Sequence, residues 1–286
     1  MIGDLELGES LGRGAHSTVY RAAGRGRSFT VKVSHALARD DRALLLQFRR
    51  EAAILAGLRH AGIPAVHEVG ETAEGHAYFV MDFVTGQTLA SRLAAGALDQ
   101  SQVRTLAIRL AEVLTTVHQR GLIHRDVKPS NVIVSNDLDP TLIDFGLATR
   151  SRADNDNHTV GTFLYSAPEQ TGMLKRRVDG RADLYSLGVV RYECLTGAPP
   201  FHADDPAELL RLHAVQKHEP LAERVPNVDP ALARIIDKLL AKDPDDRYAS
   251  TLKLREDLER LDAADVIRSL RPQLSVPPGG HHALPW

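Results

Sequence analysis

The 286-residue sequence lacks three features that are each typical of a class of protein: several cysteines, an excess of basic residues and a long apolar run. It has one cysteine, which excludes a disulfide scaffold and fits a reducing cytoplasm. Lys and Arg number 35 against 37 Asp and Glu, and without a basic excess we expect no nucleic-acid ligand. No run of about 18 apolar residues occurs, and the N-terminus lacks the pattern of a signal peptide. We therefore expect neither secretion nor a membrane segment in this chain.

The first part of the chain has the character of a small antiparallel sheet with one helix. Hydrophobic residues make up 43% of the sequence, enough for a sizeable core. Apolar and β-branched segments bounded by turn residues predict strands at 5–12, 17–23, 28–34, 66–72 and 77–83. Between them, residues 42–58 repeat apolar side chains at spacings of three and four, which predicts a helix.

Beyond a break at 85–89 the pattern becomes mainly helical. Helices are predicted at 102–119, 183–196, 230–241 and 250–262. The expected fold class is α+β, with a small β-rich lobe carrying one main helix at about 1–84 and a larger, mainly α-helical lobe at about 85–264. Residues 265–286 contain prolines and glycines without periodicity, which predicts a flexible tail or linker that could tether a further module.

One loop concentrates chemically active side chains. Residues 124–131 read HRDVKPSN and combine an imidazole, a guanidinium, a carboxylate, an ammonium and a carboxamide. The loop follows a predicted helix and precedes VIV, which has the character of a short buried strand. A rigid scaffold of this kind commonly displays catalytic groups, although a solvated polar surface is the alternative.

Four further features each have an ordinary structural explanation when taken alone. LGRGAHSTV at 11–19 is a glycine-rich turn that would cradle phosphate oxygens or only shape a hairpin. Lys32, on a strand, points into a cleft or outward. Glu51, on the following helix, pairs with Lys32 or is solvated. Asp144, in LIDFGLA, ends a strand as a ligand for a hard cation or as part of a turn.

The order of these features decides between the explanations. A glycine loop, a strand lysine, a helix glutamate, HRDVKPSN, DFG and SAPE at 166–169 follow one another as in the eukaryotic-type protein kinases. The sequence resembles that family over roughly residues 5–262. Lys128, two positions after Asp126, makes the sequence similar to the serine/threonine class. The compactness of the sequence is similar to that of bacterial members. The resemblance implies a bilobal kinase domain at 1–264.

The resemblance also implies catalytic roles. Asp126 would accept the proton of the substrate hydroxyl, and Lys128 would lie beside the γ-phosphate of ATP. Lys32, held by Glu51, would clamp the α- and β-phosphates. The implied Mg²⁺ ligands are Asn131 and Asp144.

Nucleotide-binding positions follow from the same resemblance. They are Leu11, Gly12, Gly14, Val19, Thr30, Lys32, Asp82, Val84 and Ile133. Asp82 and Val84 would bind adenine through backbone groups that follow Met81. The sequence departs from the family pattern at Ser17, which replaces a third glycine, and at Thr30, which replaces the usual alanine. Both departures affect the fit of the nucleotide more than the catalytic groups.

Other matching residues are expected to support the site. Asp183 would brace the catalytic loop, and Glu169 would pair with Arg247. Thr162, in GTFLYSAPE, would contact the catalytic Asp and Lys in members that act on proteins.

Phosphorylation in the loop 147–166 is expected to switch activity, with Thr159 as the best candidate. Arg125 would then pair with the new phosphate and order the loop. The alternative is that Asp154 and Asp156 partly satisfy Arg125 without modification.

The expected activity is that of a cytoplasmic, ATP-dependent serine/threonine protein kinase acting in signalling. Its expected partners are proteins that carry Ser or Thr, together with a second copy of the chain for trans-autophosphorylation. Two other classes stay open. A pseudokinase scaffold would bind partners without transferring phosphate, but such proteins usually lack the Asp, Asn or Lys present here. A small-molecule phosphotransferase would keep the phosphate-binding parts and lack the peptide-docking segment. The physiological substrate, the upstream signal and the oligomeric state are not readable from the sequence.

Overall fold

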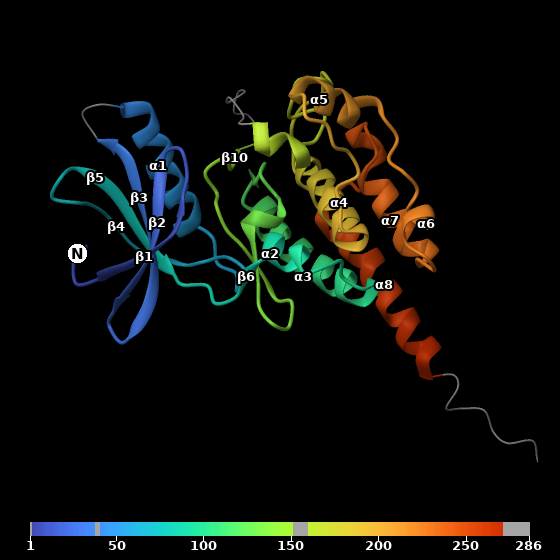
Figure 1. The fold of residues 1–286 in the computed structure, drawn as a ribbon, viewed down its shortest axis with the longest axis horizontal. Coiled ribbons are helices and arrows are strands. Elements are labelled where there is room, and N and C mark those ends of the chain that lie inside the picture. The colour runs from blue at the N-terminus through green and yellow to red at the C-terminus, as the bar shows by residue number, and fades with distance from the viewer. Residues whose placement is uncertain (1, 38–40, 151–159, 271–286) are drawn as a thin grey trace, which may run out of the picture.

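The computed structural model describes residues 2–37, 41–150 and 160–270, without the side chains of 149–150, 160–162 and 262–270. A five-stranded antiparallel sheet of order β1-β2-β3-β5-β4 forms the first lobe, and α1 (Arg42–Ala56) lies beside it (Figure 1). The strands are β1 (Glu6–Arg13), β2 (Ser17–Gly24), β3 (Arg27–Leu37), β4 (Val66–Glu71) and β5 (His76–Asp82).

The two faces of this sheet bury different sets of side chains. Phe29 and Val31 of β3 pack in a cluster that the N-terminal residues Ile2 and Leu5 complete. Because side chains alternate along a strand, Lys32 projects from the opposite face, which α1 covers. The strand pattern therefore places the lysine between the sheet and the helix.

The second lobe is mainly helical and lies to the right in Figure 1. Its helices are α2 (Leu89–Ala94), α3 (Gln100–Gln119), α4 (Arg181–Thr196), α5 (Pro206–Val215), α6 (Leu221–Arg224), α7 (Pro230–Leu239) and α8 (Thr251–Leu270). Short strands and 3₁₀ turns shape the region between the lobes: β6 (Gln87–Thr88), β7 (Leu122–Ile123), η1 (Pro129–Asn131), β8 (Val132–Val134), β9 (Pro140–Leu142), β10 (Thr149–Arg150), η2 (Val160–Tyr165) and η3 (Pro244–Asp246).

Helix α4 is the centre of this lobe. It buries residues on all sides, as expected for a helix that is not amphipathic and is enclosed by others. Gly188 lets α7 approach closely, because a Cβ atom there would lie 2.7 Å from the Cβ atom of Leu239. The buried helix gives the loops at its N-terminal end a fixed support.

The predicted α+β, two-lobed architecture is confirmed. The strands of the first lobe and the helices α1, α3, α4 and α7 lie within a few residues of their predicted positions. Helices α2, α5 and α6 were not predicted. Helix α8 continues to Leu270, across the predicted start of the tail at 265, because AADVIRSL at 263–270 contains no Gly or Pro. Residues 271–286 lie outside the described part of the chain.

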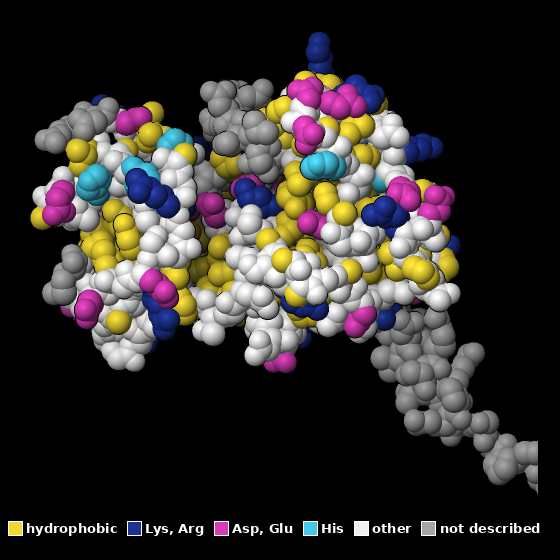
Figure 2. Space-filling view, viewed as in Figure 1, with side chains coloured by type: hydrophobic (Ala, Val, Ile, Leu, Met, Phe, Trp, Pro, Cys, Tyr) yellow, Lys and Arg dark blue, Asp and Glu magenta, His cyan; other side chains and the backbone are white. Residues whose placement is uncertain are grey.

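Charged side chains of both signs occur on both lobes of the face drawn in Figure 2. Within residues 2–37, 41–150 and 160–270, no helix combines the length and the apolar character that crossing a membrane requires.

Candidate active site

The loop 124–128, predicted to be catalytic, is held by a carboxylate beneath it. Asp183, in the first turn of α4, is fully buried and accepts backbone hydrogen bonds from His124 at 2.9 Å and Arg125 at 2.8 Å. The Nε2 atom of His118 lies 2.8 Å from the same carboxylate. Burial acts to raise the pKa of Asp183, but the hydrogen bond and charge of His118 outweigh it and the pKa is lowered. These hydrogen bonds are the ones expected if Asp183 braces the loop.

Asp126 lies at the centre of a compact polar cluster. Its Oδ2 atom is 2.7 Å from the Nζ atom of Lys128 and accepts a 2.8 Å hydrogen bond from the Asn131 amide. The same amide nitrogen also donates to the Asp126 carbonyl at 2.9 Å. Only 8% of Asp126 is exposed, so the carboxylate is held in one orientation instead of facing open solvent.

Two residues of the site adopt left-handed backbone conformations. Arg125 has φ = 68° and Asp144 has φ = 62°, and neither is glycine. Such residues cost on the order of 1 to 3 kcal/mol each, and the surrounding structure must hold them. Strain of this kind gathers at functional sites, and here it lies at Arg125, immediately before Asp126, and at Asp144 itself.

Lys32 lies between two carboxylates. Its Nζ atom is 2.6 Å from Oε1 of Glu51 and 3.2 Å from Oδ1 of Asp144. Burial alone would lower the pKa of Lys32, but the two carboxylates outweigh it and raise the pKa, so the ammonium stays charged. Burial and the charge of Asp144 raise the pKa of Glu51, despite Lys32. Desolvation opposes ionisation of Asp144, yet Lys32 and the Gly146 N–H keep the pKa of Asp144 low.

The DFG turn is locked by its phenylalanine. Phe145 is fully buried, and its ring lies edge-on to the His124 ring at 4.6 Å between centroids. Burial lowers the pKa of His124, which favours a neutral ring at this contact. The packing links the catalytic loop to the turn that carries Asp144.

A cavity of about 510 Å³ lies between the lobes. Of the predicted site residues it is lined by Gly14, Lys32, Glu51, Asp126, Lys128 and Asp144. Asn131 does not line this cavity, but its amide nitrogen donates to the carboxylate of Asp126, which does. The cleft thus brings together residues of both lobes, from Gly14 to Asp144.

The residues predicted around adenine do not line this cavity: they are Leu11, Gly12, Val19, Thr30, Asp82, Val84 and Ile133. Strand pairing still places Thr30 opposite Met81, the residue before the predicted adenine-binding segment. The Asp82 N–H donates to the Ala65 carbonyl at 3.0 Å. The Asp82 N–H is therefore already engaged within the protein.

Several residues at the cavity were not predicted from the sequence. Gln47, one helical turn before Glu51, lines it and donates from Nε2 to the Gly146 carbonyl at 3.2 Å. That spacing on α1 is the signal that could have found it. His16 and Tyr165 also line the cavity, and no pattern in the sequence singled them out.

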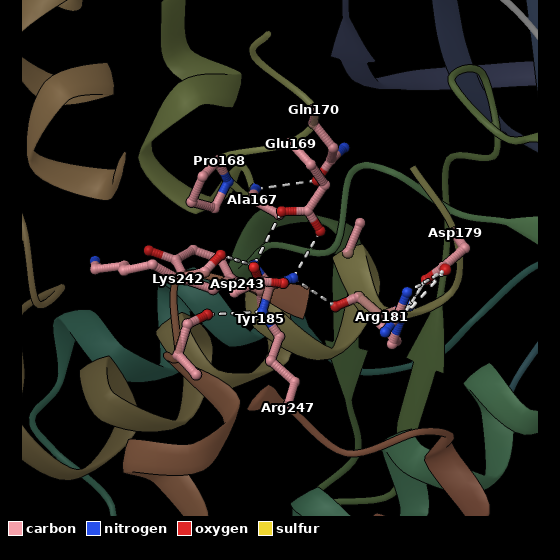
Figure 3. Close-up of polar contacts among 12 residues, drawn as sticks. Ala167, Pro168, Glu169, Gln170, Asp179, Arg181, Tyr185, Lys242, Asp243 and Arg247 are labelled. Atoms are coloured by element: carbon pink, nitrogen blue, oxygen red, sulfur yellow. Dashed lines mark hydrogen bonds and ion pairs between the residues drawn. The ribbon is translucent and has the colours of Figure 1, made fainter. Parts of the chain in front are cut away.

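The segment 166–170 is fixed to the helical lobe. Glu169 and Arg247 form the expected pair, with both side chains almost fully buried and atoms 2.6 Å apart. Figure 3 shows the Arg247 fork facing the Glu169 carboxylate, with a second set of contacts to nearby carbonyls. Gln170 bonds to the Arg125 carbonyl at 2.9 Å and to the Ala167 N–H at 3.1 Å. The catalytic loop and the SAPE segment are thereby joined.

The expectations for Asp154, Asp156 and Thr159 fall outside the described residues, and so does the side chain of Thr162.

Comparison with known proteins agrees with this geometry. The protein kinase domain profile matches residues 5–257. The chain is 38% identical over 268 residues to the serine/threonine-protein kinase PknB of Mycolicibacterium smegmatis, which covers 90% of this chain and 42% of that protein. It is 34% identical over 272 residues to a protein of Bifidobacterium longum named probable serine/threonine-protein kinase PknB, covering 90% and 39%. The chain spans about two fifths of the length of these relatives. By the profile match and these identities, the chain belongs to the protein kinase domain family.

Proposed function

We propose that this chain transfers the γ-phosphoryl group of ATP to Ser and Thr hydroxyls of proteins that act in signalling. Its own loop at 147–166 is one of the proposed substrates. The observation that carries the proposal is the cleft in which Lys32 lies between Glu51 and Asp144 while Asp126 faces Lys128. The relatives' printed names, all serine/threonine-protein kinases, support the same reaction class.

The cleft has the donor groups that ATP and Mg²⁺ require. Its volume of about 510 Å³ lies in the range of small-molecule sites, and the cations Lys32 and Lys128 line it. The Asp144 side chain is 46% exposed, and Asn131, whose amide nitrogen is engaged by Asp126, keeps its carboxamide oxygen as a possible metal ligand. No group of three His, Cys, Asp or Glu ligands forms a preformed cation cage among the described residues. This fits Mg²⁺, which is usually held by one or two carboxylates with substrate phosphates.

The proposed reaction assigns one task to each residue. Asp126 accepts the proton of the substrate hydroxyl while the hydroxyl oxygen bonds to the γ-phosphorus. The bond between the γ-phosphorus and the oxygen that bridges it to the β-phosphate breaks, and ADP leaves. Lys128 places positive charge beside Asp126, where charge develops in the transition state. Lys32 holds the non-reacting phosphates, and Glu51 fixes Lys32. Bound Mg²⁺ would neutralise phosphate charge next to Asp144.

We further propose domain limits of 1–264, with the β-rich lobe at about 1–84 and a flexible tail beyond the kinase domain. The family match over 5–257 supports the first limit. The continuous helix α8 moves the earliest start of an irregular tail to 271. A cytoplasmic location, self-association and protein substrates belong to the same proposal, and the single cysteine is compatible with that compartment.

Phosphotransfer assays test the reaction class directly. The protein would be incubated with labelled ATP and Mg²⁺, first with a generic basic protein and then with sugars and aminoglycosides. Label in the basic protein and in the chain itself is the expected result. Label only in a small molecule would replace the proposal with a small-molecule phosphotransferase, and nucleotide binding without transfer would indicate a pseudokinase.

Phosphorylation of Thr159 is the proposed switch. Mass spectrometry of the active protein should find phosphate in the loop 147–166, and Thr159→Ala should lower activity at least about tenfold, because the phosphate would order the loop against Arg125. Full activity of the variant would show that loop carboxylates or a partner supply that order.

A further inference from the structure

A histidine on β3 is bonded to the glycine-rich turn above the cleft. His35 lies three residues after Lys32, where β3 runs beside the turn between β1 and β2. Its backbone N–H donates to the His16 carbonyl at 2.8 Å. Its ring reaches two further residues of the same turn, with Nδ1 3.2 Å from the Ala15 carbonyl and Nε2 2.7 Å from Oγ1 of Thr18.

The chemistry of these partners fixes the roles of the ring nitrogens. The Ala15 carbonyl can only accept, so Nδ1 must carry the hydrogen. In a neutral imidazole Nε2 then accepts from the Thr18 hydroxyl. In a protonated ring Nε2 donates to the Thr18 oxygen instead. The ring therefore bridges the two sides of the turn in either protonation state.

Strand pairing holds the two ends of the turn, with Arg13 opposite Thr18 and Thr18 opposite Val33, whereas the tip of the turn has few other contacts. A Cβ atom at Gly12 would meet nothing within 4 Å, and one at Gly14 would meet only the Ser17 carbonyl, at 3.7 Å. Gly14 and Ser17 also share a backbone hydrogen bond of 2.9 Å. Among the described residues, the side-chain hydrogen bonds that reach Ala15 and Thr18 from outside the turn come from His35.

The turn faces the proposed phosphate site. Gly14, Ala15, His16 and Ser17 line the same cavity as Lys32 and Asp144. A turn whose tip is held by few contacts would sample open conformations, and the cost of ordering that tip would reduce the affinity for a nucleotide. A preformed bridge removes part of that cost before the nucleotide arrives.

We propose that His35 is a positioning residue that holds the glycine-rich turn closed over the nucleotide phosphates through Ala15 and Thr18. The inference rests on the proposed nucleotide-binding function and adds to it the residue that sets the turn's conformation. It acts on nucleotide affinity, since His35 contacts the turn and lies outside the residues that line the cavity.

The test compares His35→Ala with His35→Gln, whose amide can donate to a carbonyl and accept from a hydroxyl. His76→Ala is the control, because His76 lies on β5 and no hydrogen bond joins its ring to the turn. Two measurements are made on each protein: hydrogen–deuterium exchange of residues 10–20 without nucleotide, and the Kd for a fluorescent ATP analogue with Mg²⁺. Kinetics with a peptide substrate give kcat and both KM values.

His35→Ala should speed exchange in residues 10–20 and raise the Kd and the ATP KM about fivefold to tenfold, as expected for the loss of one or two hydrogen bonds. The peptide KM should stay within twofold. His35→Gln should recover most of the affinity. Thr18→Val should act in the same direction, and the double variant Thr18→Val/His35→Ala should be no worse than His35→Ala, because both changes break one bridge.

Unchanged exchange and Kd in His35→Ala, with wild-type protein that binds the nucleotide, would overturn the inference and leave the proposed function standing. Equal losses for nucleotide and peptide would also overturn it, since they indicate general destabilisation. Wild-type protein that binds no nucleotide would overturn both.

Discussion

At the scale of single residues, two side chains hold the carboxylate of Asp126 in place. Lys128 and Asn131 both contact its Oδ2 atom. Asp126→Asn keeps the size of the side chain and removes its ability to accept a proton. We expect phosphotransfer to fall by about 10²- to 10⁴-fold, the usual contribution of a general base, with the melting temperature little changed.

The control is Asp137→Asn, because Asp137 is an exposed carboxylate outside the cleft. Initial rates with a peptide substrate and a thermal melt of each variant make the measurement. Near-normal turnover of Asp126→Asn would reject the assigned mechanism.

Gln170 offers a second residue-scale prediction. It is 5% exposed, and its amide joins the Arg125 carbonyl to the Ala167 N–H. Gln170→Ala leaves both backbone groups without this partner beside the strained Arg125. We expect kcat to fall about tenfold or more, because small displacements of catalytic groups are costly, while the Kd for Mg-ATP stays within about twofold.

Gln119→Ala, at an exposed position near the end of α3, is the matched control. Steady-state kinetics and nucleotide titration separate the two quantities. A rise in the Kd equal to the loss of kcat would contradict the assigned role.

At the scale of elements, helix α8 makes its buried contacts early. Thr251, Leu254 and Leu258 are buried, and Leu261 packs against the core. Truncation after Asp262 keeps these four residues, so we expect the melting temperature to fall by less than about 2 °C, which corresponds to a loss of at most about 1 kcal/mol for a chain of this size.

A second truncation, after Leu270, keeps the whole of α8 and removes only residues 271–286. Thermal melts of both truncations and the full chain make the comparison. A fall of several degrees on removing 271–286 alone would mean that the tail docks on the domain.

At the scale of the whole molecule, buried histidines predict how stability depends on pH. His213 is fully buried against Tyr185, and burial, with a smaller effect from Lys242, lowers the pKa of His213 to about 4. The unfolded chain binds this proton near pH 6.5, before the folded chain does. Stability is therefore full above about pH 6.5 and decreases as the pH falls toward 4, by up to about 3 kcal/mol from this group.

Urea unfolding at pH 7.5 and pH 5 measures the difference. His213→Gln should flatten the pH dependence, although it lowers stability at neutral pH. His202→Gln is the control, because the His202 side chain is 76% exposed. An unaltered pH dependence in His213→Gln would show that other groups, such as His124, dominate the acid response.

The candidate site could be predicted from residue types, their order and their periodicity. Lys32, Glu51, Asp126 and Asp144 could be selected because phosphoryl transfer needs fixed residue types in a fixed order, and strand alternation and helical spacing set the direction of each side chain. The two lobes followed from the change of period near residue 85. These features are local patterns of chemistry and periodicity, which the chain carries before it folds.

The contacts between distant groups could not be predicted, because they depend on how the chain packs. The His35 bridge to Ala15 and Thr18 and the Gln170 contact with Arg125 are not readable, because each links segments whose separation depends on packing. The hydrogen bond from the Asp82 N–H to the Ala65 carbonyl could not be predicted either, because it depends on how the chain enters β4. Hydrogen bonds require alignment within a few tenths of an ångström, and periodicity fixes only which face a residue occupies. The sequence therefore specifies which groups are available, and the packed fold selects their partners.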